Sequence, residues 1–297
     1  SLLLDFNLFG DFEKLSNLFG GRLKKPISEG SGGFLGEAAF NLKAGEVSGV
    51  VENINKTFYK DKLRTRALIN FSVKIPSGSI FGLLGPNGAG KTTCFYIACG
   101  LVRADKGQVF IGNMKVSKLP MHKRAKLGLG YLPQEPSIFR KLTVEDNILA
   151  VLELNRALPS SRRKHRLEEL LTEFRVDHIR HIKGISLSGG ERRRVEIARA
   201  LAMEPKFILL DEPFASQDIT LRAQMRDDVM HILREAGVAA LLVTHDPEEA
   251  MQFADRIAIM HDGKIEQIGE PSEVYDNPCS AFVASFFGQV NAMKGVV

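Results

Sequence analysis

Apolar positions along the chain follow two different periods, and together they predict an α/β fold. Alternation at 49–58 and 67–75 is typical of half-buried antiparallel strands, whereas short apolar runs are typical of buried strands. Such runs predict further strands at 79–85, 107–113, 206–211 and 239–245, and a hairpin at 256–269. Apolar residues that return every three or four positions predict helices at 90–101, 143–155, 161–174, 191–203, 221–235 and 246–254. Because strands alternate with helices, the chain should form a mainly parallel sheet with helices on both faces.

Local signals support two of these helices. Thr143, with Asp146 three positions later, has the sequence of a helix-starting capping box. The helix at 161–174 should bury one apolar face, made of Leu167, Leu170, Leu171 and Phe174.

Residue composition and hydrophobic pattern change along the chain and divide it into three parts. Residues 1–45 are rich in Phe, Leu, Gly and Ser, and 28–37 resemble a flexible connector, so we interpret 1–45 as a flexible N-terminal extension. The alternative is a short amphipathic segment that docks on the body or on a partner. Residues 46–270 form the predicted α/β domain, with a mostly helical subdomain at about 136–189, and 271–297 form a C-terminal tail.

Composition adds limits to this picture. The 297 residues are 44% apolar and 25% charged, and the net charge of +5 permits a phosphate-rich ligand or a membrane surface without requiring either. No window approaches the roughly 18 apolar residues of a membrane span, and the first residues lack the basic region of a secretory signal. The three cysteines, of which Cys94 and Cys99 are on different faces of one predicted helix, are expected to be reduced thiols of a cytosolic protein.

A glycine-rich loop between a predicted strand and a predicted helix is the strongest chemical signal. It matches the pattern G-x-x-x-x-G-K-[ST] and consists of Gly85, Pro86, Asn87, Gly88, Ala89, Gly90, Lys91 and Thr92, followed by Thr93. Backbone N–H groups of such a loop curl round a phosphate, and the helix that follows directs its positive end at the same anion. Lys91 would reach the outer phosphates, and the Thr92 hydroxyl can ligate Mg²⁺.

Two adjacent acids at the end of a buried strand supply a second part of such a site. Asp211 and Glu212 follow the apolar run at 207–210. Asp211 can hold Mg²⁺ through water, and Glu212 can polarise an attacking water as a general base.

The phosphate loop, "LSGGE" at 187–191 and "LLDEP" at 209–213 occur in an order that resembles the ATP-binding-cassette (ABC) ATPases. The resemblance covers about 47–270. It implies a P-loop NTPase core with a mainly parallel sheet, an N-terminal antiparallel β-subdomain and a helical subdomain, with ATP and Mg²⁺ as cofactors.

Several site residues are implied by this resemblance alone. Gln134 resembles the glutamine that contacts Mg²⁺ and the attacking water, and His245 resembles the switch histidine that contacts the γ-phosphate. Phe58 is the best candidate for the aromatic ring that stacks on adenine, with Tyr59 as a rival.

The signature residues Ser188, Gly189, Gly190 and Glu191 open a predicted helix, an arrangement suited to an anion. In the family, two subunits meet head to tail, and each ATP lies between the phosphate loop of one subunit and the signature of the other. The resemblance therefore implies a homodimer, or a heterodimer with another cassette protein. We interpret the arginines of the helix at 191–203 as surface or interface side chains rather than as part of the chemistry.

One motif departs from the family pattern. The segment that crosses the dimer interface is represented by 215–218, in which Asp218 fits, whereas Gln217 stands where an apolar residue is usual and Ile219 where proline is common. The departure affects the expected coupling between the two sites and leaves the ATPase prediction unchanged.

The middle of the chain, about 80–215, resembles the ATPases of lipopolysaccharide-export systems, and the end resembles ATPases of binding-protein-dependent importers of inorganic ions and small solutes. We give the middle more weight, because the surface that faces the membrane subunits should lie there. The expected protein is an ATPase at the cytoplasmic face of the inner membrane, bound to integral membrane subunits, with no nucleic-acid partner. A soluble ABC ATPase of DNA repair or translation is a further alternative. Such proteins usually carry two cassettes or a long coiled-coil insertion, which this sequence does not show.

Overall fold

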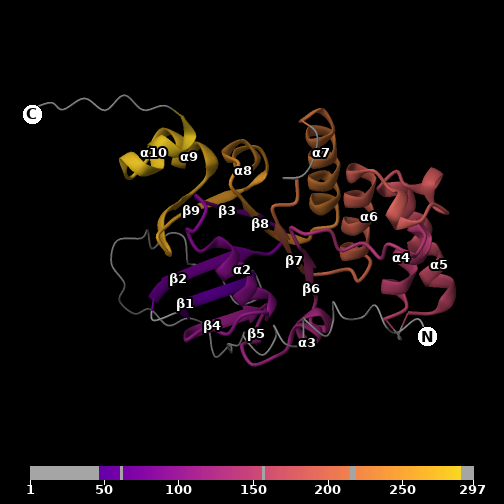
Figure 1. The fold of residues 1–297 in the computed structure, drawn as a ribbon, viewed down its shortest axis with the longest axis horizontal. Coiled ribbons are helices and arrows are strands. Elements are labelled where there is room, and N and C mark those ends of the chain that lie inside the picture. Colours follow the sequence, from indigo (N-terminus) through magenta and orange to yellow (C-terminus); the bar gives the residue numbers. More distant parts are fainter. Residues whose placement is uncertain (1–46, 61–62, 156–157, 215–218, 289–297) are drawn as a thin grey trace, which may run out of the picture.

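The computed structural model describes residues 47–60, 63–155, 158–214 and 219–288 of the chain. Two sheets stand side by side, and a group of helices extends from one end of the larger sheet (Figure 1). Within the described ranges, no helix is long and apolar enough to cross a bilayer.

The smaller sheet is antiparallel, as the alternating pattern predicts. Its strand order is β2-β1-β4-β5, and the strands are β1 (Val47–Lys60), β2 (Leu63–Pro76), β4 (Lys106–Ile111) and β5 (Met114–Lys115). In β2 the buried positions alternate with more exposed ones, and Phe71, Val73 and Ile75 point into the core. The N-terminal antiparallel subdomain is therefore confirmed.

The larger sheet has the order β10-β9-β3-β8-β7-β6, and its pairs are parallel except for the hairpin of β9 and β10. Its strands are β3 (Ile80–Leu84), β6 (Leu129–Leu132), β7 (Phe207–Asp211), β8 (Ala239–Thr244), β9 (Arg256–His261) and β10 (Lys264–Gly269). All residues of β3, β7 and β8 are buried, as expected for strands covered on both faces.

Helices cover both faces of this sheet, which confirms the predicted layering. In β7, Leu209 belongs to the apolar cluster of Phe95 on α2 (Lys91–Cys99), whereas Ile208 belongs to the cluster of Leu233 on α7 (Ile219–Glu235). The opposite assignment of neighbouring strand residues follows from the two-residue period of a strand.

The helical subdomain contains α4 (Val144–Leu152), α5 (Ser160–Glu173) and α6 (Gly189–Leu201), with two short 3-10 turns between α5 and α6, η2 (Asp177–Ile179) and η3 (Gly184–Ser186). The four apolar residues predicted to share a face of the second helix are all buried in one cluster: Leu167, Leu170, Leu171 and Phe174. Packing of this face therefore holds the subdomain together.

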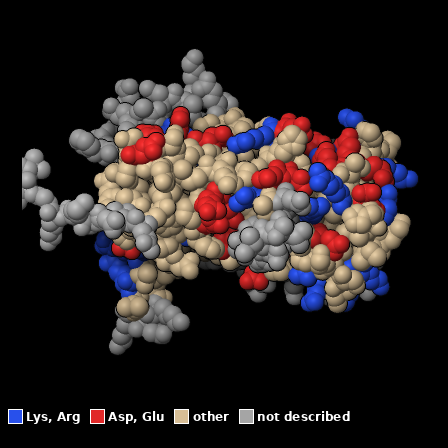
Figure 2. All heavy atoms as spheres, turned by 90° about the horizontal axis from the view of Figure 1, so that it is seen from above, with Lys and Arg blue, Asp and Glu red and all other residues tan. Residues whose placement is uncertain are grey.

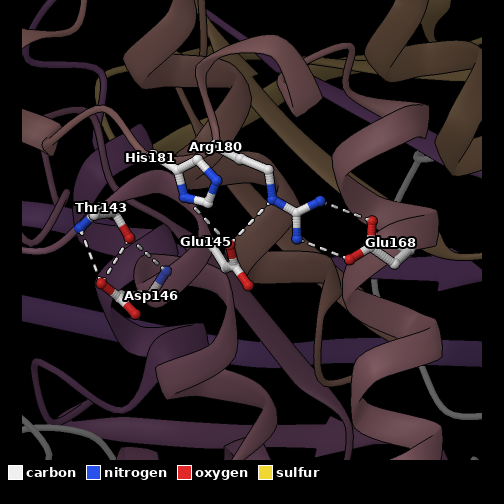
Figure 3. Close-up of polar contacts among 6 residues, drawn as sticks. All are labelled: Thr143, Glu145, Asp146, Glu168, Arg180 and His181. Atoms are coloured by element: carbon white, nitrogen blue, oxygen red, sulfur yellow. Dashed lines mark hydrogen bonds and ion pairs between the residues drawn. The ribbon is translucent and has the colours of Figure 1, made fainter.

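Figure 3 shows how polar side chains fix its helices. The predicted cap is present: the Asp146 backbone N–H donates to Thr143 Oγ1 at 3.1 Å, and the Thr143 hydroxyl donates to Asp146 Oδ2 at 2.6 Å. The Arg180 guanidinium donates to Glu145 on α4 at 3.1 Å and to both carboxylate oxygens of Glu168 on α5 at 2.8 and 3.1 Å. Arg180 thus ties two helices to the segment that leads into α6.

Charged side chains gather over this subdomain. On the face seen from above, acidic and basic residues are interspersed at the end that carries the helices, a group of acidic residues lies near the middle, and much of the opposite part is uncharged (Figure 2).

One helix that the sequence pattern did not indicate is α3 (Met121–Lys126), which precedes β6. Six residues are too few to show a helical period. Its Arg124 is completely buried and donates to the backbone oxygens of Ile97 and Ala98, at 3.0 and 2.8 Å, in the last turn of α2. A cation at the carboxyl end of a helix satisfies these oxygens and opposes the negative end of the helix dipole.

The two ends of the chain differ in what the structure describes. Residues 1–45, interpreted as an N-terminal extension, lie outside the described residues. The described part of the predicted C-terminal tail contains two short helices, α9 (Pro271–Asp276) and α10 (Ala281–Phe287). The helix before the β9–β10 hairpin is α8 (Pro247–Phe253). Val274 and Val283 are fully buried in a cluster with Leu84 at the end of β3. The two short helices are therefore packed on the main domain.

Candidate active site

The phosphate loop lies between β3 and α2, in the strand–loop–helix setting that its pattern requires. Gly90 has a φ of 103°, and a side chain there would clash with the backbone oxygen of Ala67 on β2. At Gly85, a Cβ would lie 2.5 Å from the backbone oxygen of Met260 on β9. Two loop glycines are thus required by neighbouring strands as well as by the turn itself.

The other loop residues take the places expected for a loop round an anion. Asn87 and Gly88 are exposed, Pro86 is half-buried and Ala89 is buried, while Thr92 and Thr93 stand in the first turn of α2, where Thr92 is exposed. The N-terminus of α2, with its free N–H groups, therefore opens toward the loop.

Lys91 is buried with its ammonium directed into the loop. It donates to the backbone oxygens of Gly85 and Pro86, the latter at 3.0 Å. Burial lowers the pKa of Lys91, and the nearby carboxylates of Glu212 and Asp211 oppose that change. The lysine is thus held where a phosphate group would meet it.

Asp211 ends β7 and is almost completely buried. Burial raises its pKa to about 6, helped by the Glu212 carboxylate, while the cations of Arg193 and Lys91 act in the opposite direction. A buried carboxylate next to a second carboxylate is a site that a divalent cation would stabilise.

Glu212 contacts both of the other residues predicted to be catalytic. Gln134 Nε2 donates to Glu212 Oε2 at 2.9 Å, and His245 Nδ1 lies 3.1 Å from Glu212 Oε1. The side chain of Glu212 is 15% exposed, and that of His245 is 54% exposed. The three residues come from widely separated parts of the sequence, and the fold brings them together.

The backbone of Glu212 is strained. Its φ of 42° lies in the left-handed region, which costs a residue with a side chain about 1–3 kcal/mol. Its N–H donates to the backbone oxygen of Val243 on β8 at 2.8 Å, which holds this conformation in place. In this conformation the carboxylate contacts Gln134 and His245 at the end of the strand.

Two residues that sequence reasoning missed fix the start of the His245 loop. Thr244 Oγ1 donates to Glu249 Oε2 at 2.7 Å and accepts from the Asp246 backbone N–H at 3.0 Å. Both Thr244 and Glu249 are buried. The only sequence signal was a hydroxyl and an acid on either side of a helix start, which is common at ordinary helix ends.

The signature sequence forms the start of α6. Ser188 is the N-cap: its Oγ accepts from the Glu191 backbone N–H at 3.4 Å, and the Glu191 carboxylate accepts from the Ser188 N–H and hydroxyl at 2.8 and 2.7 Å. These hydrogen bonds lower the pKa of Glu191. Ser188 and Gly189 are exposed and Gly190 is half-buried, so the end of the helix that is predicted to bind an anion lies at the surface.

The expectation that the arginines of α6 are surface or interface side chains is wrong for Arg193. Its guanidinium is buried and donates to the backbone oxygens of Pro133 at 2.8 Å and Pro213 at 2.7 Å, and to Glu196 at 3.1 Å. Pro133 precedes Gln134, and Pro213 follows Glu212. Arg193 therefore joins α6 to both catalytic segments.

Glu196 and Arg199 continue this contact along the same helix. Glu196 accepts from the backbone N–H groups of Ser137 and Ile138, at 2.7 and 3.0 Å. Arg199 donates to the Ser137 oxygen at 2.7 Å and lies over the ring of Phe139, 4.0 Å from its centroid. The spacing of three residues places all these side chains on one helix face, a period that was visible in the sequence.

The two candidate adenine-stacking rings are exposed on β1. Phe58 is 40% exposed, with the ammonium of Lys56 at 5.1 Å from its ring centroid, and Tyr59 is 74% exposed. Both rings remain candidates. Asp218, together with Gln217, lies outside the described residues.

Comparisons with known proteins agree with this architecture. The family model described as ABC transporter matches residues 68–215. The lipopolysaccharide export system ATP-binding protein LptB of Acidithiobacillus ferridurans is 48% identical over 229 residues, which cover 75% of this chain and 92% of the relative. LptB of Escherichia coli strain K12 is 48% identical over 209 residues, 70% of this chain and 86% of the relative.

Solved structures show the same fold. The dimeric post-hydrolysis state of the cassette MJ0796, bound to ADP and Pi, superposes with a TM-score of 0.67 at 29% identity, covering 75% of this chain and 98% of that one. The structure of cbiO1 from Clostridium perfringens, part of the transporter complex cbiONQ, has a TM-score of 0.70 at 26% identity, covering 78% and 92%. With its phosphate loop, signature and paired acids, this chain belongs to the ATP-binding proteins of the ABC transporter family.

Proposed function

We propose that this ABC ATPase drives the export of lipopolysaccharide, as a dimer bound to integral membrane subunits at the cytoplasmic face of the inner membrane. The observation that carries the proposal is the 48% identity to LptB proteins over 86–92% of their length. The ATPase is not expected to contact the transported lipid, because its site is suited to the phosphates of a nucleotide. The choice of the transported molecule therefore belongs to the membrane subunits.

Glu212 is the general base of the proposed reaction. Its carboxylate takes a proton from the water that attacks the γ-phosphate, while Gln134 and His245 hold that carboxylate from two sides at 2.9 and 3.1 Å. Lys91 contributes positive charge to the outer phosphates from within the loop. Because little covalent chemistry falls to the protein in phosphoryl transfer, positioning and charge account for most of the catalysis.

The residues present fit a Mg²⁺ ion. Asp211 is a buried carboxylate with a raised pKa, Thr92 has an exposed hydroxyl at the start of α2, and Gln134 offers an amide oxygen. These are oxygen ligands of the kind that Mg²⁺ prefers, and they would hold the ion beside the phosphates. Bound there, Mg²⁺ would neutralise charge on the phosphate oxygens.

The signature implies a shared site. The loop that precedes α2 and the start of α6 belong to different parts of one molecule, with strands of the main sheet between α2 and α6 (Figure 1). Ser188, Gly189 and Gly190 of one subunit would therefore contact the ATP held by the loop of a second subunit. To change the ratio of closed to open dimers from 1:99 to 99:1, ATP must bind the closed dimer more strongly than the open one by roughly 5.5 kcal/mol. Two shared phosphate sites can supply this difference.

Import of an inorganic ion or small solute is the alternative, favoured by the resemblance of the end of the chain to importer ATPases. A pull-down distinguishes the two. The tagged full chain, expressed with the genes of its own host, is purified from membranes, and its partners are identified by mass spectrometry and reconstituted in proteoliposomes. Export predicts that the complex of this chain with its membrane partners hydrolyses ATP faster when lipopolysaccharide is present. The same complex with the Glu212→Gln variant is the inactive control. Partners from a periplasmic-binding-protein system, with no response to lipopolysaccharide, would refute export.

A further inference from the structure

The turn between β9 and β10 contacts the phosphate loop directly. The N–H of Gly263, in this turn, donates to the backbone oxygen of Ala89 at 3.0 Å, and the Gly263 oxygen accepts from the N–H of Ile69 on β2 at 2.8 Å. Gly263 therefore joins the phosphate loop to β2, the strand paired with β1, which carries the candidate adenine-stacking rings.

Close packing requires a glycine in this turn. Gly263 has a φ of 77°, and a Cβ there would lie 2.8 Å from the backbone oxygen of Ala67. The position of the turn is therefore passed to the loop through backbone atoms, with no flexible side chain between them.

The C-terminal helix α10 is stacked on the same hairpin. The ring of Phe282 lies parallel to the imidazole of His261, with centroids 3.9 Å apart and planes inclined by 10°. His261 is the last residue of β9 and is two positions before Gly263. The stack thus fixes the hairpin at the end that contacts the phosphate loop.

Two further contacts hold α10 in this place. Val283, next to Phe282, is fully buried with Leu84, the residue that directly precedes Gly85. The N–H of Cys279 donates to Gln267 on β10 at 2.8 Å. The helix is therefore attached both to the strand that enters the phosphate loop and to the hairpin that supports it.

We propose that His261 and Phe282 are positioning residues for ATP binding, which act on the phosphate loop through Gly263. The stack holds the hairpin turn, the turn holds the Ala89 oxygen, and this hydrogen bond sets the curvature of the loop that receives the phosphates. Loss of the stack loosens the loop and weakens ATP binding, whereas the catalytic group at Glu212 remains in place. The proposal rests on ATP binding at this loop, which the Lys91→Ala variant tests separately.

The test measures the Kd of the full-length protein for a fluorescent ATP analogue with Mg²⁺, together with the KM and kcat of hydrolysis. Phe282→Ala and His261→Ala should each raise the Kd about five- to tenfold, and the two effects should add far less than fully in the double variant, because both changes remove one stack, while His261→Ala also removes the contact of the imidazole with Glu266 at 3.6 Å. The kcat at saturating ATP should stay within about twofold. Phe282→Tyr keeps the stack and should restore the parental Kd.

Controls separate this role from general packing. Tyr275→Ala removes an exposed ring of α9 that packs on Phe287, with centroids 5.9 Å apart, and should leave the Kd unchanged. Phe282→Leu keeps apolar volume without the stacked ring, and it replaces Phe282→Ala if that variant does not fold. Thermal unfolding without nucleotide shows whether each variant is folded. A parental Kd in Phe282→Leu and His261→Ala, or an equal loss in Tyr275→Ala, would overturn the proposal.

Discussion

Gln134 Nε2 donates to the carboxylate of Glu212 at 2.9 Å, across a distance of 78 residues in the sequence. The second carboxylate oxygen faces His245 at 3.1 Å. A carboxylate held from two sides has a defined direction, which a general base needs. The pair also connects the exit of β6 with the exit of β7.

The Glu212→Gln variant tests this assignment. Glutamine has nearly the same shape but does not accept a proton, so ATP hydrolysis should fall about 100-fold or more, while ATP binding stays at the parental level. Because bound ATP is no longer consumed, the closed dimer should accumulate. Phosphate release and analytical size-exclusion chromatography with ATP measure the two effects. Full turnover by this variant would contradict the role of Glu212.

The buried Asp211 predicts a pH dependence of stability in the nucleotide-free protein. Its pKa of about 6 is higher than the ordinary 3.8, so the folded state holds a proton that the unfolded chain releases at intermediate pH. Asp211 therefore adds stability at low pH, and this contribution is lost as the pH rises through 6. Asp211→Asn removes the titration and should be more stable than the parent by about 3 kcal/mol at neutral pH, with little difference near pH 4.

Urea unfolding at several pH values without nucleotide or Mg²⁺ measures this difference. Asp276→Asn, at an exposed position on α9, is the matched control and should follow the parental curve. A gap between Asp211→Asn and the parent that is the same at every pH would show that the Asp211 carboxyl does not titrate as described.

The parts of the site that the sequence revealed are those with short-range signals. The loop from Gly85 to Thr92 must place backbone N–H groups within one turn, so its chemistry is confined to a few adjacent residues. Asp211 and Glu212 could also be recognised from adjacent residues, because they directly follow an apolar run that predicts a buried strand. The alternation of 49–58 and 67–75 indicated the antiparallel sheet for a similar reason.

Contacts between distant segments could not be read in this way. Arg193 has the sequence context of an exposed helical arginine, and only the fold shows that its partners are the backbone oxygens of Pro133 and Pro213. Backbone oxygens leave no mark on the sequence. Gly263 resembles any turn glycine, although its N–H supports the phosphate loop. The pattern identifies the chemical groups, and the tertiary contacts that orient them become visible only in the structure.

Arg193 should matter for stability as well as for position. Arg193→Met removes the guanidinium that donates to the buried Glu196 carboxylate and the donors to Pro133 and Pro213, so we expect a loss of about 3–5 kcal/mol. Arg194→Ala is the matched control, because Arg194 is half-buried and its contact with Asp228, at 3.4 Å, is near the surface. It should cost less than about 1 kcal/mol. Denaturant unfolding compares the two variants, and similar losses would argue against a special role for Arg193.

The shared-site arrangement predicts complementation between two inactive variants. Lys91→Ala should lose nucleotide binding at its own loop, and Ser188→Arg should bind ATP yet fail to hydrolyse it, because the arginine obstructs the partner's phosphate. Mixed dimers would combine the intact loop of the Ser188→Arg chain with the intact signature of the Lys91→Ala chain. If subunits exchange freely, half of the dimers are mixed and each has one complete site, so activity should recover to about a quarter of the parental rate. Phosphate release from a titration of one variant into the other measures this recovery, with each variant alone as the baseline. A mixture that stays at the baseline, although cross-linking shows mixed dimers, would mean that loop and signature act within one chain.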